Sequence, residues 1–490
     1  MNAPAGAATP RVAIIGSGFS GIAAAIALRK KGIEDFTIFE QAPELGGTWF
    51  YNRYPGAEVD LESHIYSFSF ERYDWTRTHA GWQELLGYLN HVARKWDLPR
   101  RILFNEKVED VTWSDSDHTY TLTTSTGVDH GSFTAVISAV GFLNIPLMPP
   151  FAREEHDFEG IVCHTSRWPE GADMAGKSIG VVGTGSSAVQ VVTEAERVGK
   201  DVKIFQIEPN WLLPKESRDF TPAERRLNRF SPVYAYRRLK LYVNYDVRQY
   251  RSSHARSTGF TNKRKRRASE AFLQQELGSR PDLLKLATPS FPYEGRRTVV
   301  SDTYYRSLLS PKVTLVPHAV KGLTRTGAID ANGDEHDLDM IVLATGFDAA
   351  NYLGNYRVHG RGGVDLHAEW KGEPEAFLGM MVPGFPNFFI MYGPNTNAIP
   401  LVSFYEAQAG FVASLIGRAA KQRRSTIEVR RSAFVIYNDW IQERLAKTVW
   451  SRTRNYFQAG TGRVVSQWPF GATSYILATK VLRRIAVRLS

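Results

Sequence analysis

The sequence contains a single cysteine, Cys163, among its 490 residues. One thiol excludes an internal disulfide, a CxxC redox pair and a multi-cysteine metal site. We therefore predict no metal centre and no transfer of electrons through a protein dithiol. A reducing cytoplasm is the simplest compartment for such a chain.

Long apolar runs are also missing, since no uninterrupted run is long enough to cross a bilayer. Residues 12–28 are rich in small apolar side chains, but they lack a basic leading region. Gly16, Gly18 and Gly21 interrupt this stretch at turn spacing, which is not typical of a signal peptide. We expect neither a targeting segment nor an integral membrane segment.

The composition is that of an ordinary globular protein, with 43% hydrophobic and 22% charged residues. Much of the net charge of +10 comes from the stretch between Arg218 and Arg267, which ends in the basic run 263–267. Aromatic residues here are scattered at helical spacing and form no stacking platform. We predict a solvated helical face and no nucleic-acid partner. A loose, salt-sensitive association with an anionic membrane is the alternative.

Two segments have the order strand, glycine turn, helix, strand. In the first, apolar residues 11–15 precede a turn with Gly16, Gly18 and Gly21, and Glu40 ends the second strand. The first glycine permits the turn, the second lets the backbone approach a pyrophosphate, and the third lets the helix pack on the strand. Glu40 can bind ribose hydroxyls. This segment predicts a dinucleotide site.

The second segment repeats this spacing after the apolar residues 178–182. Its turn consists of Gly183, Thr184, Gly185, Ser186 and Ser187. The register places Ile207 where the first segment has Glu40, and a neutral residue does not repel a 2′-phosphate, which favours NADP. The neighbouring Glu208 argues for the opposite preference, and Arg296 is a candidate phosphate ligand. Two dinucleotides on one chain indicate electron transfer between cofactors.

The chain resembles the type I Baeyer–Villiger monooxygenases, within the class B flavoprotein monooxygenases. Residues 158–169, FEGIVCHTSRWP, match the family fingerprint FxGxxxHxxxWP. Further matches lie at GGTW…RYPG…D in residues 46–60, at FD in 347–348 and at FPNFFIMYGPN in 385–395. The resemblance implies an α/β fold with two Rossmann-like dinucleotide-binding domains, one for FAD and one for NADP, and an inserted helical subdomain.

The resemblance assigns the family's catalytic arginine to Arg297 and its partner carboxylate to Asp60. From the residues alone, Arg297 could also be a phosphate ligand or a surface residue, and Asp60 an N-cap. The linker and conformational residues are Phe158, Gly160, His164 and Trp168. His164 is also well explained as a hydrogen-bonded structural histidine.

The glycine motifs and the resemblance together imply a set of cofactor-binding residues. They are Gly16, Gly18, Gly21, Glu40, Gly47, Thr48, Trp49, Asp60, Tyr66, Gly183, Thr184, Gly185, Ser186, Ser187, Arg296 and Asn395.

The resemblance also implies a reaction. NADPH reduces FAD, reduced flavin and O₂ give a C4a-peroxyflavin, and the peroxide attacks a ketone to yield an ester or lactone. A fixed guanidinium suits the negative charge that develops, because it does not lose its proton. The expected partners are a small-molecule ketone and O₂, and the protein is expected to be a monomer or homodimer.

The sequence departs from the family pattern at three places. Ile207 stands where an arginine often reads the 2′-phosphate, so the preference for NADPH over NADH is less fixed. Arg296 replaces a frequent lysine and keeps only its charge. The C-terminal stretch departs at Arg454 and Asn455, which bears on substrate scope.

Three other functions were weighed against this one. A related flavin monooxygenase that oxidises nitrogen or sulfur would share the fold. A pyridine-nucleotide disulfide reductase lacks support because the chain has no dithiol. A cofactor-binding protein without activity is disfavoured by the presence of both Asp60 and Arg297.

The motifs divide the chain into interrupted domains. We expect an FAD-binding domain from residues 1–145 and 338–490, and an NADP-binding domain from 146–212 and 296–337. The segment 213–295 has helical patterning without a nucleotide motif and is expected to be a helical insertion.

Overall fold

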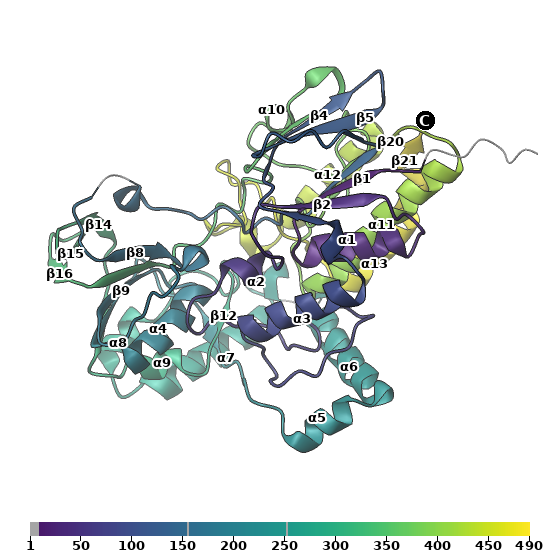
Figure 1. Cartoon of the computed structure of the whole chain (residues 1–490). Helices are drawn as coiled ribbons and strands as arrows, with labels where there is room; N and C mark the ends of the chain where they lie inside the picture. Colours follow the sequence, from purple (N-terminus) through teal and green to yellow (C-terminus); the bar gives the residue numbers. More distant parts are fainter. Residues whose placement is uncertain (1–8, 154–155, 251–252) are drawn as a thin grey trace, which may run out of the picture.

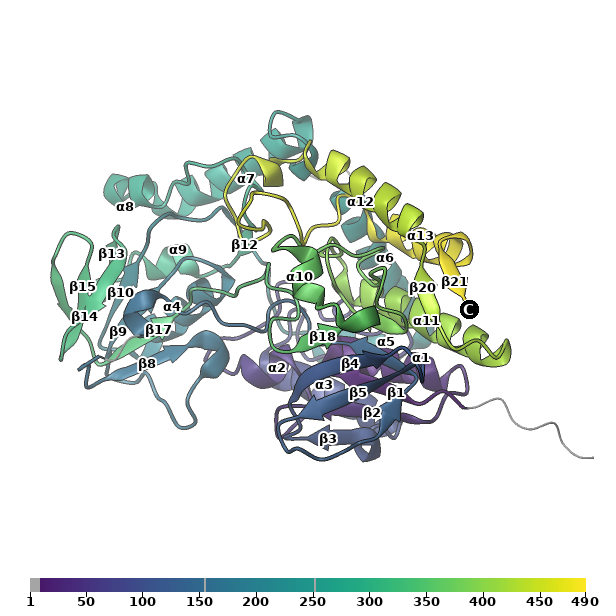
Figure 2. The ribbon, with the colours of Figure 1, turned by 90° about the horizontal axis from the view of Figure 1, so that it is seen from above.

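The computed structural model of the chain describes residues 9–153, 156–250 and 253–490. It contains two parallel sheets, each flanked by helices, and a helical segment below them (Figure 1). Seen from above, the two units lie side by side, and helices of the helical segment and of the C-terminal part run along one side of both (Figure 2).

The first sheet has the strand order β19-β7-β1-β2-β3, and all neighbouring strands are parallel. Its strands are β1 (Val12–Ile15), β2 (Phe36–Glu40), β3 (Ile102–Phe104), β7 (Ala135–Ser138) and β19 (Phe388–Ile390). Strands β1, β7 and β19 are buried at every position, as expected for parallel strands covered on both faces. Helix α1 (Phe19–Arg29) packs against α11 (Leu401–Lys421). This unit therefore combines the two ends of the chain.

The second sheet has the order β13-β10-β9-β17-β8 and is also entirely parallel. Its strands are β8 (Ile161–His164), β9 (Ser178–Val182), β10 (Asp201–Phe205), β13 (Val313–Val316) and β17 (Met340–Leu343). Helix α4 (Ser186–Val198) follows β9 and packs against α9 (Tyr304–Ser307). A small antiparallel sheet adjoins this unit and consists of β14 (Val320–Leu323), β15 (Gly327–Asp330) and β16 (Glu335–Asp337).

Strand β17 corrects the expected return of the chain to the first domain at residue 338. It pairs with β9 on one side and β8 on the other, so residues 340–343 belong to the second sheet. An apolar strand that ends in a small residue and glycine fits either sheet, and only its hydrogen-bonding partners decide between them. The chain returns to the first unit after β17.

The first unit carries additional elements around its sheet. A four-stranded sheet with the order β18-β4-β5-β6 contains β4 (Val108–Ser114), β5 (Thr119–Thr124), β6 (Ser132–Phe133) and β18 (Arg357–His359). The helices α2 (Thr48–Tyr51), α3 (Trp82–Lys95), α10 (Leu366–Trp370), α12 (Arg431–Leu445) and α13 (Ala472–Ile485), with the hairpin of β20 (Ile427–Val429) and β21 (Val487–Leu489), complete it.

Residues 213–295 are largely helical. Their helices are α5 (Pro222–Asn228), α6 (Ser231–Tyr250), α7 (Phe260–Leu277) and α8 (Pro281–Leu286). A capping box of Thr221 and Glu224 starts α5, which forms the lowest point of Figure 1. The two ends of the segment meet because β11 (Leu212–Leu213) pairs in parallel with β12 (Val299–Val300). No helix within the described residues is both long enough and apolar enough to cross a membrane.

Candidate active site between the two nucleotide units

The backbone of the first glycine turn is packed so closely that it leaves no room for side chains. Gly16 has φ +100°, and a Cβ atom there would lie 2.8 Å from the carbonyl oxygen of Ala139 at the end of β7. A Cβ on Gly21 would lie 1.9 Å from the carbonyl oxygen of Gly16. Gly47, with φ +54°, touches the same turn, since its Cβ would come within 2.9 Å of the Gly18 Cα. Two glycine turns distant in sequence therefore build one wall.

A cavity opens beside this wall. Residues predicted to bind a cofactor that line it are Gly16, Gly18, Glu40, Gly47, Thr48 and Tyr66. Glu40 is buried at the end of β2, where one carboxylate oxygen accepts hydrogen bonds from Ser17 N at 2.9 Å and Ser17 Oγ at 2.7 Å. Trp49 lies buried behind the lining, and its indole N–H donates to Tyr66 Oη at 3.2 Å. Trp49 therefore orients a lining residue.

The second glycine turn repeats the first. Gly183 has φ +121°, and its Cβ would lie 2.5 Å from the carbonyl oxygen of Ala344 at the end of β17. Gly185 precedes α4, and no atom other than those of its chain neighbours lies within 4 Å of where its Cβ would be. The turn is thus closed against its sheet and open toward the front of the helix, where an anion can approach the helix N-terminus.

Charged side chains stand beside this second turn. Arg296 Nη2 lies 2.6 Å from a Glu208 carboxylate oxygen, and Thr184 Oγ1 donates to the Glu208 carbonyl at 2.8 Å. Ile207 points away, with 85% of its surface exposed. Thr184 and Arg296, both predicted to bind a cofactor, thus contact the same residue, Glu208. Arg296 is therefore paired with the carboxylate that would repel a 2′-phosphate.

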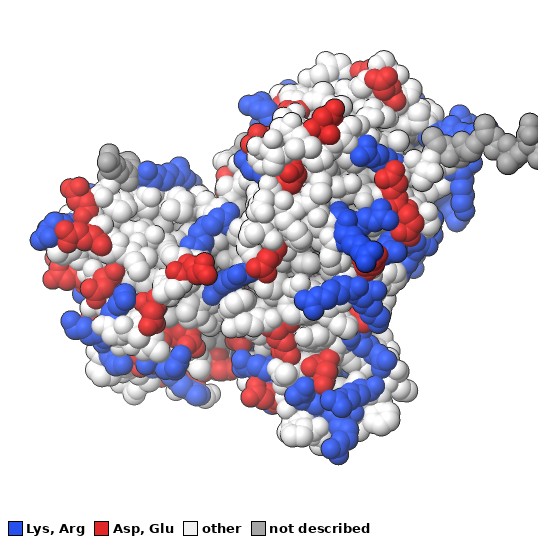
Figure 3. Space-filling model, viewed as in Figure 1, with Lys and Arg blue, Asp and Glu red and all other residues white. Residues whose placement is uncertain are grey.

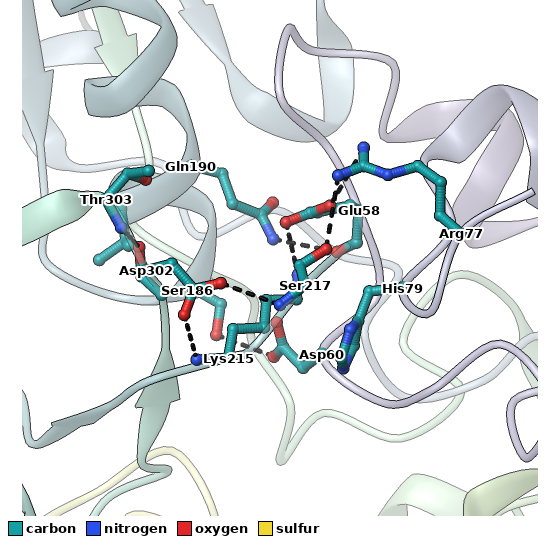
Figure 4. Close-up of polar contacts among 12 residues, drawn as sticks. Glu58, Asp60, Arg77, His79, Ser186, Gln190, Lys215, Ser217, Asp302 and Thr303 are labelled. Atoms are coloured by element: carbon teal, nitrogen blue, oxygen red, sulfur yellow. Dashed lines mark hydrogen bonds and ion pairs between the residues drawn. The ribbon is translucent and has the colours of Figure 1, made fainter. Parts of the chain in front are cut away.

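Arg297 and Asp60 meet where the two units adjoin. Arg297 Nη2 donates to Asp60 Oδ2 at 2.5 Å, and Ser186 Oγ at the start of α4 donates to the same oxygen at 3.1 Å. Figure 4 shows Asp60 between Ser186 and His79. The Asp60 side chain is 13% exposed, whereas that of Arg297 is 49% exposed and so has a free surface. One carboxylate therefore holds the arginine and contacts the second glycine turn.

Tyr456 is a second neighbour of Arg297 and was not predicted from the sequence. Partial removal from water by the surrounding protein opposes the charge of Arg297, but the Asp60 carboxylate and a hydrogen bond with Tyr456 outweigh it and raise its pKa above the ordinary value. Asn455 Nδ2 donates to the Gly295 carbonyl at 2.9 Å, which fixes the C-terminal stretch next to the arginine pair. The departure from the family pattern at Asn455 thus has a structural role beside Arg297.

A charge cluster around the buried Lys215 lies near Asp60 (Figure 4). Lys215 Nζ lies 2.6 Å from a carboxylate oxygen of Glu58, and Asp302 accepts the backbone N–H of Lys215 at 2.8 Å. The charge of Lys215 is therefore balanced by an internal ion pair with Glu58. Burial and the Lys215 charge lower the pKa of His79 to about 4.

His164 is a buried, hydrogen-bonded residue at the end of β8. Its Nδ1 accepts the backbone N–H of Ser166 at 3.1 Å, and its Nε2 donates to the Gly346 carbonyl at 3.0 Å. Burial lowers the pKa of His164 to about 4, so the ring is neutral near pH 7. Ser166 and the nearby Phe347 line the first cavity. His164 thus holds the end of the second sheet against the wall of the first site.

The remaining fingerprint residues pack within the second unit. Phe158 is buried, and a Cβ on Gly160 would come within 2.4 Å of both the Phe158 ring and the Asp339 carbonyl. The Trp168 indole donates to the Ala172 carbonyl at 3.2 Å. The centre of the fingerprint is strand β8, so this segment joins the two units as an edge of the second sheet.

Asn395 was also predicted to bind a cofactor, but its side chain contacts the C-terminal segment. Its amide nitrogen donates to the carbonyls of Val464 at 3.0 Å and Gln467 at 3.4 Å, and its side chain is fully buried. The structure therefore uses this amide to hold the C-terminal segment.

The two turns fit two dinucleotides. Each has a first glycine with positive φ that lies on a strand end, and each is followed by a helix N-terminus that favours phosphate charge. The first adds a buried acid, Glu40, at the end of its second strand. The fold and the site define an oxidoreductase class that binds two dinucleotides on paired α/β units.

The comparisons with known proteins agree with this class and narrow it. The family model described as pyridine nucleotide-disulphide oxidoreductase matches residues 13–313, although this chain has no dithiol. A Baeyer-Villiger monooxygenase from Pseudomonas aeruginosa is 33% identical over 507 residues, covering 99% of this chain and 94% of the relative. The FAD-binding monooxygenase ktnD from Aspergillus niger is 32% identical, covering 95% and 79%.

A solved structure described as oxidized steroid monooxygenase bound to NADP superposes with a TM-score of 0.89 at 27% identity, covering 98% of this chain and 99% of that chain. The chain belongs to the Baeyer–Villiger monooxygenase family. The family and the α/β fold class predicted from the sequence are thereby confirmed.

Proposed function

We propose that the protein uses FAD, NADPH and O₂ to convert a ketone into an ester or lactone. The observation that carries this proposal is the contact of Arg297 with Asp60 at the junction of the two units. Oxygen transfer to a carbonyl carbon develops negative charge on oxygen, and a fixed cation stabilises that charge. Arg297 has a raised pKa and remains charged throughout the working pH range.

The two turns divide the cofactors between them. FAD would lie along Gly16, Gly18, Gly47 and Thr48, with Glu40 at its ribose hydroxyls. The nicotinamide coenzyme would lie on Gly183, Thr184 and Gly185, with its adenosine end near Arg296. Bound FAD would accept a hydride from the coenzyme and, once reduced, activate dioxygen.

Each polar residue at the junction then has a distinct task. Asp60 orients the Arg297 guanidinium, and Ser186 fixes Asp60 relative to the coenzyme turn. Tyr456 shields Arg297 from the C-terminal side and accepts a hydrogen bond from it. His164 positions the wall formed by Ser166 and Phe347, and we assign it no proton transfer.

The proposal also covers the cellular compartment, the oligomeric state and the substrate. The lone thiol, Cys163, is buried and supports a reducing compartment, so we place the protein in the cytoplasm. We propose a monomer or homodimer as the active form and a small-molecule ketone as substrate.

The test incubates FAD-loaded protein with NADPH, ¹⁸O₂ and a panel of linear, cyclic and aryl ketones. Mass spectrometry should find an ester or lactone that carries one ¹⁸O atom. Arg297→Ala should lower product formation by about 100- to 1000-fold, as removal of one electrostatic donor does in other enzymes.

The control measurements separate loss of chemistry from loss of structure. Arg297→Ala should retain FAD and its melting temperature within a few degrees. NADPH oxidation without any ester, together with oxygenation of amines or thioethers, would replace this proposal with nitrogen or sulfur oxidation. Ester formation that persists in Arg297→Ala would remove the role of the arginine.

A further inference from the structure

Helices α6 and α13 expose large apolar side chains on their outer sides. We define the apolar–basic face by Tyr236, Leu239, Val243 and Val247 of α6 and Leu477, Val481 and Ile485 of α13. Each of these side chains is at least 42% exposed. Their spacing of three or four residues places them on one side of each helix. Such continuous apolar stripes on a folded protein are typical of a contact surface.

The two helices meet at the start of α13. Thr473 at the start of α13 donates its backbone N–H to Asp246 at 3.0 Å, and its hydroxyl lies 3.1 Å from that of Tyr242. The opposite sides of the helices carry the buried Tyr245 and Tyr475, which belong to the main core. Each stripe therefore lies on the side of its helix that is turned away from the core.

A groove lies where the two helices meet. Its walls include Leu239 and Tyr242 from α6, Ile476 from α13 and Phe70 from the first unit. Apolar residues of both helices therefore line this groove, together with Arg72, Arg238 and Glu406.

The exposed charged side chains between the face residues are basic, and the acid in the groove wall, Glu406, accepts hydrogen bonds from Ser69. Lys240, Lys480 and Arg484 are exposed between the apolar residues and enter no ion pair within the described part of the chain. Asp246 is the single acid in the sequences of α6 and α13, and its carboxylate is bound to the backbone of Thr473.

Helix α5 continues the same pattern. Leu227 and Phe230 are 52% and 60% exposed at its end, next to the exposed Arg226. Figure 3 shows Lys and Arg side chains gathered over this lowest part of the molecule.

We propose that the apolar–basic face docks the protein onto an anionic lipid bilayer. An amphipathic helix in this setting places its apolar side at the headgroup boundary, while neighbouring Lys and Arg reach lipid phosphates. A second copy of the chain is a poorer occupant, because a two-fold contact sets the face against itself and opposes its own positive charges. The apolar–basic face lies away from the nucleotide turns, and docking through it does not depend on which ketone is the substrate.

The test measures binding of the FAD-loaded protein to sedimenting vesicles. One set consists of phosphatidylcholine alone, and the other contains phosphatidylglycerol as well. We expect binding to the second set only, with a steep decrease as salt rises. The charge variant carries Lys240→Gln, Lys480→Gln and Arg484→Gln. Its partition coefficient should fall roughly hundredfold, since each cation at an anionic surface contributes about fivefold.

Two matched controls keep the test specific. The apolar variant Val243→Ser/Val481→Ser should bind more weakly, whereas Val128→Ser/Val364→Ser, at exposed valines elsewhere, should bind as the unmodified protein does. A basic control elsewhere on the molecule carries Lys177→Gln, Lys200→Gln and Lys371→Gln. FAD content and melting temperature verify that every variant is folded.

Two outcomes would overturn the proposal. One is equal vesicle binding by the face variants and their controls, including no binding by any of them. The other is a dimer in sedimentation equilibrium that the face variants dissociate, which would make a second copy the occupant.

Discussion

Arg297 and Asp60 lie 237 positions apart in the chain, yet their side chains approach to 2.5 Å. Arg297 follows the helical segment, whereas Asp60 belongs to the first unit and also accepts a hydrogen bond from Ser186 at the second glycine turn. The position of the guanidinium therefore depends on how both units are packed. The Arg297 guanidinium stays protonated by its own chemistry, but the direction in which it points is set by the hydrogen bond to Asp60.

We predict that Asp60→Asn lowers turnover more than it weakens ketone binding. The amide keeps the shape of the carboxylate but removes the charge that holds Arg297. A small displacement of a catalytic group costs up to about 100-fold in rate. Steady-state kinetics at saturating NADPH should show a lower kcat with a nearly unchanged KM. A raised KM at unchanged kcat would instead make Asp60 a substrate-binding residue.

The second prediction is that Glu208 influences the preference for NADP⁺ over NAD⁺. Its carboxylate occupies Arg296 at 2.6 Å and carries the same sign as a 2′-phosphate. Glu208→Gln should release Arg296 and tighten NADP⁺ binding by about tenfold, equivalent to about 1.4 kcal/mol, while NAD⁺ binding changes little. Isothermal titration calorimetry with both nucleotides measures this directly. Glu159→Gln, which breaks the exposed pair with Arg325, is the matched control. If Glu208→Gln changed the binding of NADP⁺ and NAD⁺ equally, Arg296 and Glu208 would not lie next to the 2′-phosphate of the coenzyme.

Gly16 and Gly32 allow a matched test of the first cofactor site. Both have positive φ, but a Cβ on Gly16 would meet the Ala139 carbonyl at 2.8 Å, while nothing lies within 4 Å of one on Gly32. Gly16→Ala should release FAD, because the turn must shift. Gly32→Ala should keep FAD and lose only about 1–2 kcal/mol from the left-handed backbone. Flavin absorbance after gel filtration and thermal melting distinguish the two. Full FAD content in Gly16→Ala would show that this turn does not hold the flavin.

The lowered pKa of His164 predicts a pH dependence of stability. Its folded pKa is about 4, below the ordinary value of 6.5, so between these values the unfolded chain binds the extra proton. The stability conferred by neutral His164 is complete above pH 6.5 and falls as the pH approaches 4. The loss from this residue is at most about 3 kcal/mol.

His164→Gln should reduce this loss. The free energy of unfolding of both proteins, measured by urea titration from pH 8 to pH 4, should differ most at pH 8 and converge at low pH. Some acid loss should remain, because burial also lowers the pKa of His79 to about 4 and of His64 to about 3. Parallel curves for the two proteins would show that His164 is not responsible.

Local patterns predicted the two strand–turn–helix units that the structure shows. Gly16 and Gly183 were identified because a strand, a turn and a helix follow one another within a short stretch, and the contacts they make are with adjacent elements. Glu40 was found for the same reason. Strand β17 was assigned to the wrong domain, because its apolar pattern is equally suitable for both sheets and does not encode its partners.

The sequence by itself determined the two glycine turns, the acid at the first, the fingerprint and the family. Each depends on residue identity at short spacing, where backbone conformation and close packing leave few choices. The tertiary structure decided that Arg296 pairs with Glu208, that Lys215 is held by Glu58, and that Asn395 holds the C-terminal segment. It also left the apolar stripes of α6 and α13 exposed. These are contacts between distant segments, and their partners are set only when the whole chain packs.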